Sequence, residues 1–150
     1  MTAEIPALLA MAFRTVMDQV HESLAAEGFD DVRPAHGFVF QYLSQRAAGA
    51  TAVELGGHLG VTKQAAVQLV DELEQRGYVE RGPHPTDRRS RMVVLAPRGW
   101  ACVASVVRRW GEVEARWGDL IGADRVEHLR ADLRRIVADS GQAVALRPVW

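Results

Sequence analysis

The sequence has little of what a disulfide scaffold, a zinc ribbon or a membrane protein requires. Cys102 is the only cysteine, which excludes an internal disulfide and a cysteine-rich zinc site. The longest unbroken apolar run covers the seven residues 7–13, too short to cross a bilayer. No basic residue precedes Arg14, which argues against a secretory signal. These absences predict a soluble cytoplasmic protein with no metal, no cofactor and no membrane partner.

An excess of charge of either sign is also lacking. The 18 lysines and arginines nearly balance 19 aspartates and glutamates, for a net charge of -1. That balance argues against a general binder of polyanions. The charges are unevenly placed, however, because residues 1–61 hold three arginines against seven acids while residues 62–98 hold seven basic residues against five acids. The middle third is therefore the segment where we expect a basic surface to face an acidic partner.

Apolar residues spaced by three and four predict long amphipathic helices toward both ends of the chain. The first covers about residues 4–27 and ends at Gly28, and two more fill about residues 97–140 with a break near Gly122. Helices of this length in a small protein often pack on a partner subunit. Between them we expect a lobe of residues 34–96. The whole chain of 150 residues is predicted to be a single, mainly α domain with a small β-hairpin.

The segment from residue 51 to residue 77 carries the signals of two short helices. Thr51 and Glu54 have the spacing of a capping box, in which each side chain accepts the other's backbone N–H. Thr62 suits the N-cap of a second helix over residues 63–75, which Gly77 stops. Two helices joined by a short turn containing Gly60 predict a helix-turn-helix.

The outward face of this second helix begins without an acid. At 100° per residue, the residues expected to face inward are Ala66, Val67, Val70, Leu73 and Gly77. The outer face of its start comprises Thr62, Lys63, Gln64, Ala65 and Gln68. Amides pair with adenine, a small alanine meets a thymine methyl, and lysine reaches guanine or phosphate. The alternative interpretation is an ordinary solvated polar face.

Residues 78–81 and 91–95 are β-rich and separated by turn formers, which predicts a hairpin with a longer loop. Its loop concentrates Arg88, Arg89 and Arg91 beside Asp87. A planar, permanently charged guanidinium suits a narrow minor groove. We expect Asp87 to hold Arg89 by a charge-assisted hydrogen bond. The alternative is a surface turn whose arginines serve solubility.

Taken together, these features resemble the MarR family of winged helix-turn-helix transcription regulators. The similarity rests on the order of the predicted elements, the stretch ELEQRGYVER at residues 72–81, and the wing pattern Asp87-x-Arg89 followed by Leu95 and Gly99. It implies a homodimer held by the first helix and the last two. Gly56 stands where the family often has alanine, which we expect to loosen the first helix of the motif.

The resemblance also implies how DNA is bound. The helix from Thr62 would lie in the major groove of a pseudo-palindromic double-stranded operator, and Arg89, oriented by Asp87, would enter the minor groove. Phosphate contacts would come from Lys63, Arg88 and Arg91.

Members of this family often bind small aromatic or lipophilic molecules, so the resemblance implies a repressor relieved by such a ligand. The residues expected to line the pocket are Phe13, Met17, Phe38, Tyr42, Trp100 and Trp110. The alternative is that the tryptophans pack in a dimer core or within the chain, and the sequence favours it.

The remaining reactive residue types carry no catalytic pattern. Cys102 is interpreted as a buried hydrophobe rather than a redox sensor, and the five histidines lack the close spacing of metal ligands. No serine lies in a nucleophile elbow and no phosphate-binding loop is present, so no enzyme activity is predicted. A second hypothesis is a winged-helix protein-interaction module without DNA binding. Such modules often carry acids on the recognition face and lack wing arginines, the opposite of this chain.

Overall fold

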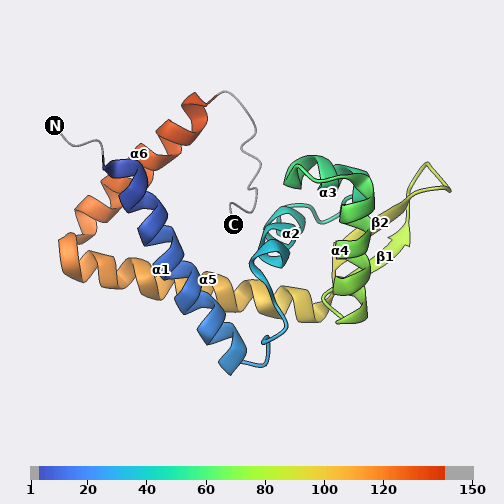
Figure 1. The fold of residues 1–150 in the computed structure, drawn as a ribbon, viewed down its shortest axis with the longest axis horizontal. Coiled ribbons are helices and arrows are strands. Elements are labelled where there is room, and N and C mark those ends of the chain that lie inside the picture. Colours follow the sequence, from blue (N-terminus) through green and yellow to red (C-terminus); the bar gives the residue numbers. More distant parts are fainter. Residues whose placement is uncertain (1–3, 141–150) are drawn as a thin grey trace. The chain divides into compact units, whose positions relative to one another are not determined.

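The computed structural model describes residues 4–140, which form helices, one β-hairpin and connecting turns (Figure 1). The elements in chain order are α1 (Ile5–Ala26), α2 (Pro34–Ser44), α3 (Ala52–Leu59), α4 (Lys63–Gln75), β1 (Val79–Pro83), β2 (Arg91–Leu95), α5 (Pro97–Ile121) and α6 (Ala123–Asp139). The predicted fold, mainly α with a hairpin wing, is confirmed. Internal contacts divide the chain into two units, residues 32–104 and residues 4–31 with 105–140, here called the winged lobe and the helical unit.

The helices of the helix-turn-helix begin and end where the capping signals predict. Thr51 Oγ1 accepts the Glu54 N–H at 3.2 Å, and the Glu54 carboxylate accepts the Thr51 N–H at 2.7 Å, so the capping box is complete. Thr62 Oγ1 accepts the Ala65 N–H at 3.1 Å and caps α4. Between the helices Gly60 adopts a left-handed conformation with φ of 67° and ends α3. Local side-chain chemistry thus sets the turn that orients α4.

Gly56 lies where α3 packs on α4. This glycine is buried, and a Cβ added to it would lie 3.2 Å from the Val61 carbonyl oxygen and 3.4 Å from the Ala66 Cβ. The missing side chain lets the two helices approach closely, and the loosening of α3 stays a prediction. Gly77 was expected on the inward face of α4, but it is exposed after the end of the helix with φ of +77°.

The hairpin pairs from Val79 opposite Leu95 to Pro83 opposite Arg91. Strand β1 begins one residue later than predicted, because the Tyr78 N–H still donates to the Leu73 carbonyl at the end of α4, at 2.9 Å. The sheet gains one contact that the sequence did not predict. Ala50 exchanges both backbone hydrogen bonds with Val93, at 3.0 and 2.8 Å, and so ties the segment before α3 to the hairpin.

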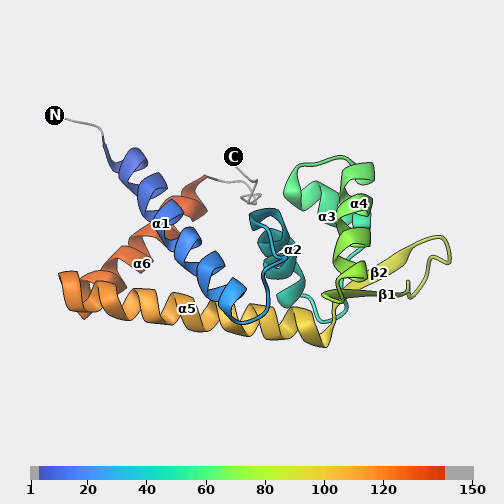
Figure 2. The same cartoon turned by 60° about the horizontal axis from the view of Figure 1, so that its bottom comes forward.

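The core of the winged lobe is formed by side chains from α2, α3, α4 and both strands. Its least exposed members include Val39, Leu43, Leu55, Val70, Leu73, Tyr78, Val79 and Val93. Cys102, near the start of α5, is fully buried as predicted. Figure 2 shows α3 and α4 side by side in this lobe, with the hairpin beyond them. The core packs against one face of α4 and leaves the opposite face of its first turns exposed to solvent.

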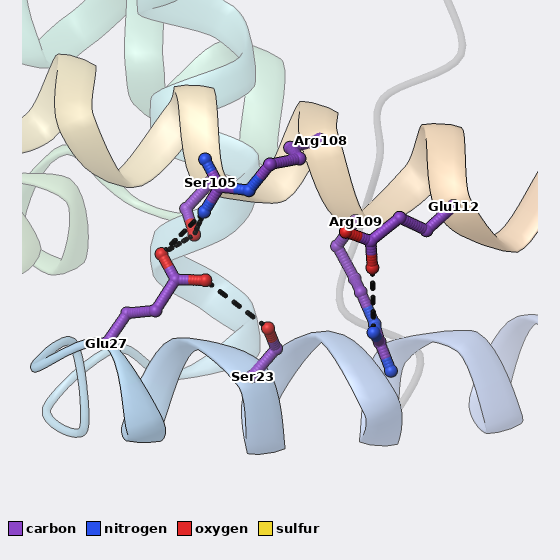
Figure 3. A network of polar contacts seen from close by, with 6 residues as sticks. All are labelled: Ser23, Glu27, Ser105, Arg108, Arg109 and Glu112. Atoms are coloured by element: carbon purple, nitrogen blue, oxygen red, sulfur yellow. Dashed lines mark hydrogen bonds and ion pairs between the residues drawn. The ribbon is translucent and has the colours of Figure 1, made fainter.

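The helical unit consists of α1, most of α5 and α6, with a turn at Gly122 between the last two. A polar network joins α1 to α5: Glu27 accepts from the Ser105 hydroxyl and from the Arg108 guanidinium, the latter at 2.7 Å (Figure 3). The hydrogen bond from Ser105, followed by that from Arg108, lowers the pKa of Glu27. The carboxylate therefore stays charged over the neutral range, and the network holds the end of α1 against α5.

No helix among residues 4–140 is long and apolar enough to span a membrane.

Candidate nucleic-acid interface

The start of α4 presents the polar surface that the sequence predicts. Thr62, Lys63, Gln64, Ala65 and Gln68 are all exposed, whereas Ala66, Val70 and Leu73 are buried in the lobe. The first acids on the helix, Asp71 and Glu72, come only in its third turn. The N-terminal end of α4 therefore offers two amides, a hydroxyl and an ammonium group to solvent, without a carboxylate beside them.

The loop of the hairpin, residues 84–90, is ordered by its own side chains. Asp87 Oδ1 accepts the backbone N–H of Arg89 at 2.9 Å, and Oδ2 accepts the Ser90 hydroxyl at 3.2 Å. The bond from the Arg89 N–H, followed by that from Ser90, lowers the pKa of Asp87. The sequence predicted a bond from Asp87 to the Arg89 guanidinium, whereas the observed bond is to its main chain. Asp87 thus sets the backbone from which the Arg89 side chain departs.

The three wing arginines have different surroundings. Arg88 and Arg89 are exposed in the loop. Arg91, also exposed, folds its guanidinium over the hairpin and donates to the carbonyls of Gly82 and Arg81, both at 3.2 Å. The sequence grouped Arg91 with the phosphate contacts, but its guanidinium already braces the two strands. Arg88 and Arg89 are the guanidinium groups that the loop presents to solvent.

A further arginine, which sequence reasoning passed over, connects the hairpin to α4. Arg81 on β1 bonds Asp71 at 2.5 Å and Glu74 at 2.9 Å, both on α4. Partial burial acts to lower the pKa of Arg81, but the bonds to Asp71 and Glu74 outweigh it and raise the pKa. The spacing of Asp71 and Glu74 on one helix face was a usable signal, because residues three apart lie side by side. This bridge links the wing to the helix whose start is exposed.

The predicted ligand-pocket residues are divided between the two units. Phe13, Met17 and Trp110 belong to the helical unit, while Phe38, Tyr42 and Trp100 belong to the winged lobe. Phe38 is buried in the lobe core. The Tyr42 ring on α2 contacts the His58 ring in a tilted arrangement, with centroids 4.3 Å apart. The Arg46 guanidinium lies 4.2 Å from the centroid of the Tyr42 ring. The pocket itself stays a prediction.

The helical unit has grooves of its own, which the sequence did not predict. One, of about 600 Å³ between α1 and α5, is lined by Ala12, Thr15, Val16, Gln19, Val113, Arg116, Trp117, Asp119 and Leu120. Another, of about 410 Å³ between α5 and α6, is lined by Glu114, Trp117, Val126, Leu129, Arg130, Leu133, Arg134, Val137 and Ala138. Trp117 contributes to both. Within residues 4–140 no group of three or more His, Cys, Asp or Glu side chains is placed to hold a metal ion.

Comparison with known proteins agrees with this geometry. The family model of the MarR family matches residues 30–90. The multiple antibiotic resistance protein MarR of Salmonella typhimurium is 34% identical over 96 residues, which cover 63% of this chain and 67% of that protein. CouR from Rhodococcus jostii, solved bound to p-coumaroyl-CoA, is similar in structure with a TM-score of 0.65 and 26% identity, covering 89% of this chain and 92% of CouR.

A mutant of MepR from S. aureus, solved bound to an oligodeoxyribonucleotide, shares the fold at a TM-score of 0.64. It is 18% identical, and the alignment covers 89% of this chain and 96% of MepR.

A capped helix-turn-helix followed by a braced hairpin defines a winged helix-turn-helix protein. With the sequence relationship to MarR, the chain belongs to the MarR family of transcriptional regulators.

Proposed function

We propose that this chain is a dimeric, sequence-specific binder of double-stranded DNA that acts as a transcriptional repressor. One observation carries the proposal: the acid-free, exposed start of α4 lies in the same lobe as a loop that exposes Arg88 and Arg89. DNA binding and repression are typical of the MarR family. The oligodeoxyribonucleotide bound to MepR, which shares the fold, supports DNA as the partner.

In this proposal the two exposed surfaces read different features of the duplex. Gln64, Ala65 and Gln68 read base edges in the major groove, with Thr62 and Lys63 at the groove margin. Arg89 enters the minor groove, whose negative potential attracts a guanidinium, and Asp87 holds the backbone that aims it. Lys63 and Arg88 neutralise phosphates. Arg91 contributes charge, since its guanidinium bonds the hairpin carbonyls.

Dimerisation through the helical unit is supported by apolar side chains that the protomer leaves exposed. On α1 these include Ile5 at 69% and Met11 at 60%, and on α5 and α6 Leu120 at 80% and Ile136 at 65%. Burying them against a second copy would bring two winged lobes onto one duplex. We therefore propose a pseudo-palindromic operator whose half-sites lie about 34–36 Å apart, one helical turn of DNA.

We further propose that a small lipophilic or aromatic ligand relieves repression in the cytoplasm. CouR bound to p-coumaroyl-CoA supports a small-molecule partner. A ligand shifts the dimer away from DNA only by its differential affinity for the two states. MarR family regulators are transcription factors rather than enzymes, and we propose no catalytic role for this chain. Screening lipophilic acids and phenols for thermal stabilisation, then for loss of DNA affinity, tests the ligand.

The alternative, a winged-helix module that binds protein rather than DNA, is opposed by the absence of acids on the exposed start of α4. Selection of binding sites from a random double-stranded DNA library by the purified protein separates the two functions. We expect enrichment of a pseudo-palindrome. A library that stays random after several rounds would favour the alternative.

On the selected site, Arg89→Ala should weaken binding at least about tenfold, the effect of losing one good specific contact. The control is Arg125→Ala, which removes the same charge from an exposed position on α6. Fluorescence anisotropy at fixed salt gives both affinities. Equal losses in the two variants would assign the effect to net charge and remove Arg89 from the interface.

The single lysine offers a direct footprint of α4. Lys63 is the only lysine of the chain, so acetylation of its amine is read by mass spectrometry without overlap from other lysines. We expect the selected duplex to protect Lys63 and a duplex of unrelated sequence to protect it less at the same concentration. Acetylation at an unchanged rate in the specific complex would place the start of α4 away from the DNA.

A further inference from the structure

A histidine ring holds the first half of the wing loop. His84 follows the last residue of β1, and its Nδ1 accepts the backbone N–H groups of Thr86 and Asp87, at 3.1 and 3.0 Å. Asp87 in turn accepts the N–H of Arg89 through its side chain and the N–H of Ser90 through its carbonyl, at 2.9 and 3.2 Å. The bonds form a chain from His84 through Asp87 to the residue that we propose enters the minor groove.

The chemistry of imidazole makes this chain dependent on one protonation state. A neutral ring that accepts at Nδ1 carries its proton on Nε2, whereas a protonated ring has two donors and no acceptor. Protonation of His84 therefore removes the acceptor for two N–H groups at once. The ordered loop and the protonated ring exclude each other, because an N–H donor cannot face two further N–H donors at these distances.

We propose that His84 is a positioning residue for the wing, which orders Arg89 for DNA only while its ring is unprotonated. The inference rests on the proposed function, since it concerns the same interface. It makes the specific part of DNA binding sensitive to protonation of this one ring. It also assigns a role to a histidine that has no metal-ligand pattern.

The charges around His84 set a competing effect that the experiment must separate. Asp87 is the acid of the loop, next to Arg88 and Arg89, and β1 carries Glu80 and Arg81. On α4 the acids facing the hairpin, Asp71 and Glu74, are paired with Arg81, and on β2 Arg91 bonds carbonyls of β1. A protonated His84 would add positive charge to this surface and strengthen non-specific attraction to phosphates. Acidification should thus lower specificity without lowering non-specific affinity.

The test uses two isosteric variants of the full chain. In His84→Asn the amide oxygen takes the place of Nδ1 and accepts hydrogen bonds without titrating, whereas in His84→Gln the acceptor lies one atom further out. NMR of the free protein follows the amides of Thr86, Asp87 and Arg89 from pH 8 to pH 5. We expect one shared titration with the ring of His84 in the wild type and none in His84→Asn. The proposal would be overturned if the amide chemical shifts of Thr86 and Asp87 did not change when the His84 ring is protonated.

DNA binding then tests the consequence for the wing. The probes are the selected duplex and a scrambled duplex, measured by anisotropy at pH 8 and pH 5.5 with folding checked by circular dichroism. The affinity ratio of the two duplexes should fall about tenfold in the wild type, as for one lost specific contact, and remain within about twofold in His84→Asn. His84→Gln should show the reduced ratio already at pH 8. An equal fall in the affinity ratio of wild type and His84→Asn would overturn the proposal. A protein that prefers neither duplex at any pH would instead overturn the proposed function. The NMR titration would then decide by itself whether His84 orders the loop.

Discussion

A single carboxylate, that of Glu72 on α4, gathers three groups in the winged lobe. Arg33 and Arg76 each bond it at 2.6 Å, and His36 Nε2 lies 3.5 Å away. Burial acts to raise the pKa of Glu72, but the charges of Arg33 and Arg76 outweigh it and lower the pKa. His36 is fully buried, and its Nδ1 accepts the Arg33 N–H at 3.0 Å at the start of α2. A neutral ring with its proton on Nε2 accepts the Arg33 N–H at Nδ1 and directs its own N–H toward the Glu72 carboxylate.

This arrangement predicts how stability responds to acid. Burial lowers the pKa of His36 below its ordinary 6.5, although Glu72 partly opposes the shift. The unfolded chain therefore takes up this proton first as the pH falls, and the free energy of unfolding decreases from about pH 6.5 down to the lowered pKa, below which the group has no further effect. Urea unfolding at fixed protein concentration between pH 8 and pH 5 should show this loss in the wild type.

The matched variant is His36→Asn, whose amide oxygen still accepts the Arg33 N–H but does not titrate. It should be less stable than the wild type at pH 8, because it loses ring volume in the core, yet lose less stability on acidification. Burial lowers the pKa of His58 as well, but both proteins share that residue. Curves that run parallel from pH 8 to pH 5 would show that His36 is not the group responsible.

At the scale of elements, Gly99 lets the first turn of α5 approach the backbone at the start of β1 very closely. A Cβ added to Gly99 would lie 2.2 Å from the Tyr78 carbonyl oxygen, and that oxygen already accepts the Ala96 N–H at 2.9 Å. The first turn of α5 is thereby held against the end of α4 and the start of β1. The wing and the recognition helix share this support.

Gly99→Ala should consequently destabilise the protein by about 1–3 kcal/mol, the usual effect of forcing atoms into a packed site. Gly111→Ala is the control in the same helix. A Cβ there meets nothing within 4 Å, so better helix propensity should stabilise it by up to about 1 kcal/mol. Thermal and urea unfolding measure both. A Gly99→Ala protein as stable as the wild type would mean that α5 moves away from β1 without loss.

For the whole molecule, we propose that the exposed apolar residues of the helical unit form the contact between two copies of the chain. Leu120→Glu replaces a side chain that is 80% exposed in the protomer, so the protomer should still fold. If this surface forms the dimer, a buried carboxylate without a partner should dissociate it, because burying an unpaired charge costs several kcal/mol. Analytical ultracentrifugation should then show a monomer that binds the selected operator weakly.

The control for this experiment lies in the other unit. Val53→Glu places the same charge at a 57% exposed position on α3, in the winged lobe, and should leave the sedimentation of the dimer unchanged. If Leu120→Glu sediments like the wild type, the surface around Leu120 does not form the dimer contact.

Features that depend on neighbours in the chain were predictable from the sequence. The caps at Thr51 and Thr62, the turn at Gly60 and the exposed start of α4 follow from side chains that bond backbone groups within three residues, or from the period of the helix. The hairpin and its arginines were predictable for the same reason, since turn formers and β-branched residues act locally. The family resemblance added the expectations of a DNA partner and of a dimer, which stay predictions.

Features that depend on distant residues required the tertiary structure. The Ala50 bridge to Val93 and the Arg33 bond to Glu72 join positions far apart in sequence, and no local pattern specifies them. Composition alone could not show that the wing arginines have different roles. The register of the strands places the Arg91 guanidinium within reach of the Gly82 and Arg81 carbonyls, whereas Arg88 and Arg89 lie in the loop. The sequence by itself determined where helices begin, which face of α4 is polar and that the wing is basic. Only the fold decided that Arg91 braces the hairpin and that Arg81 ties it to α4, because each of these bonds depends on distances between groups that propensity and periodicity do not set.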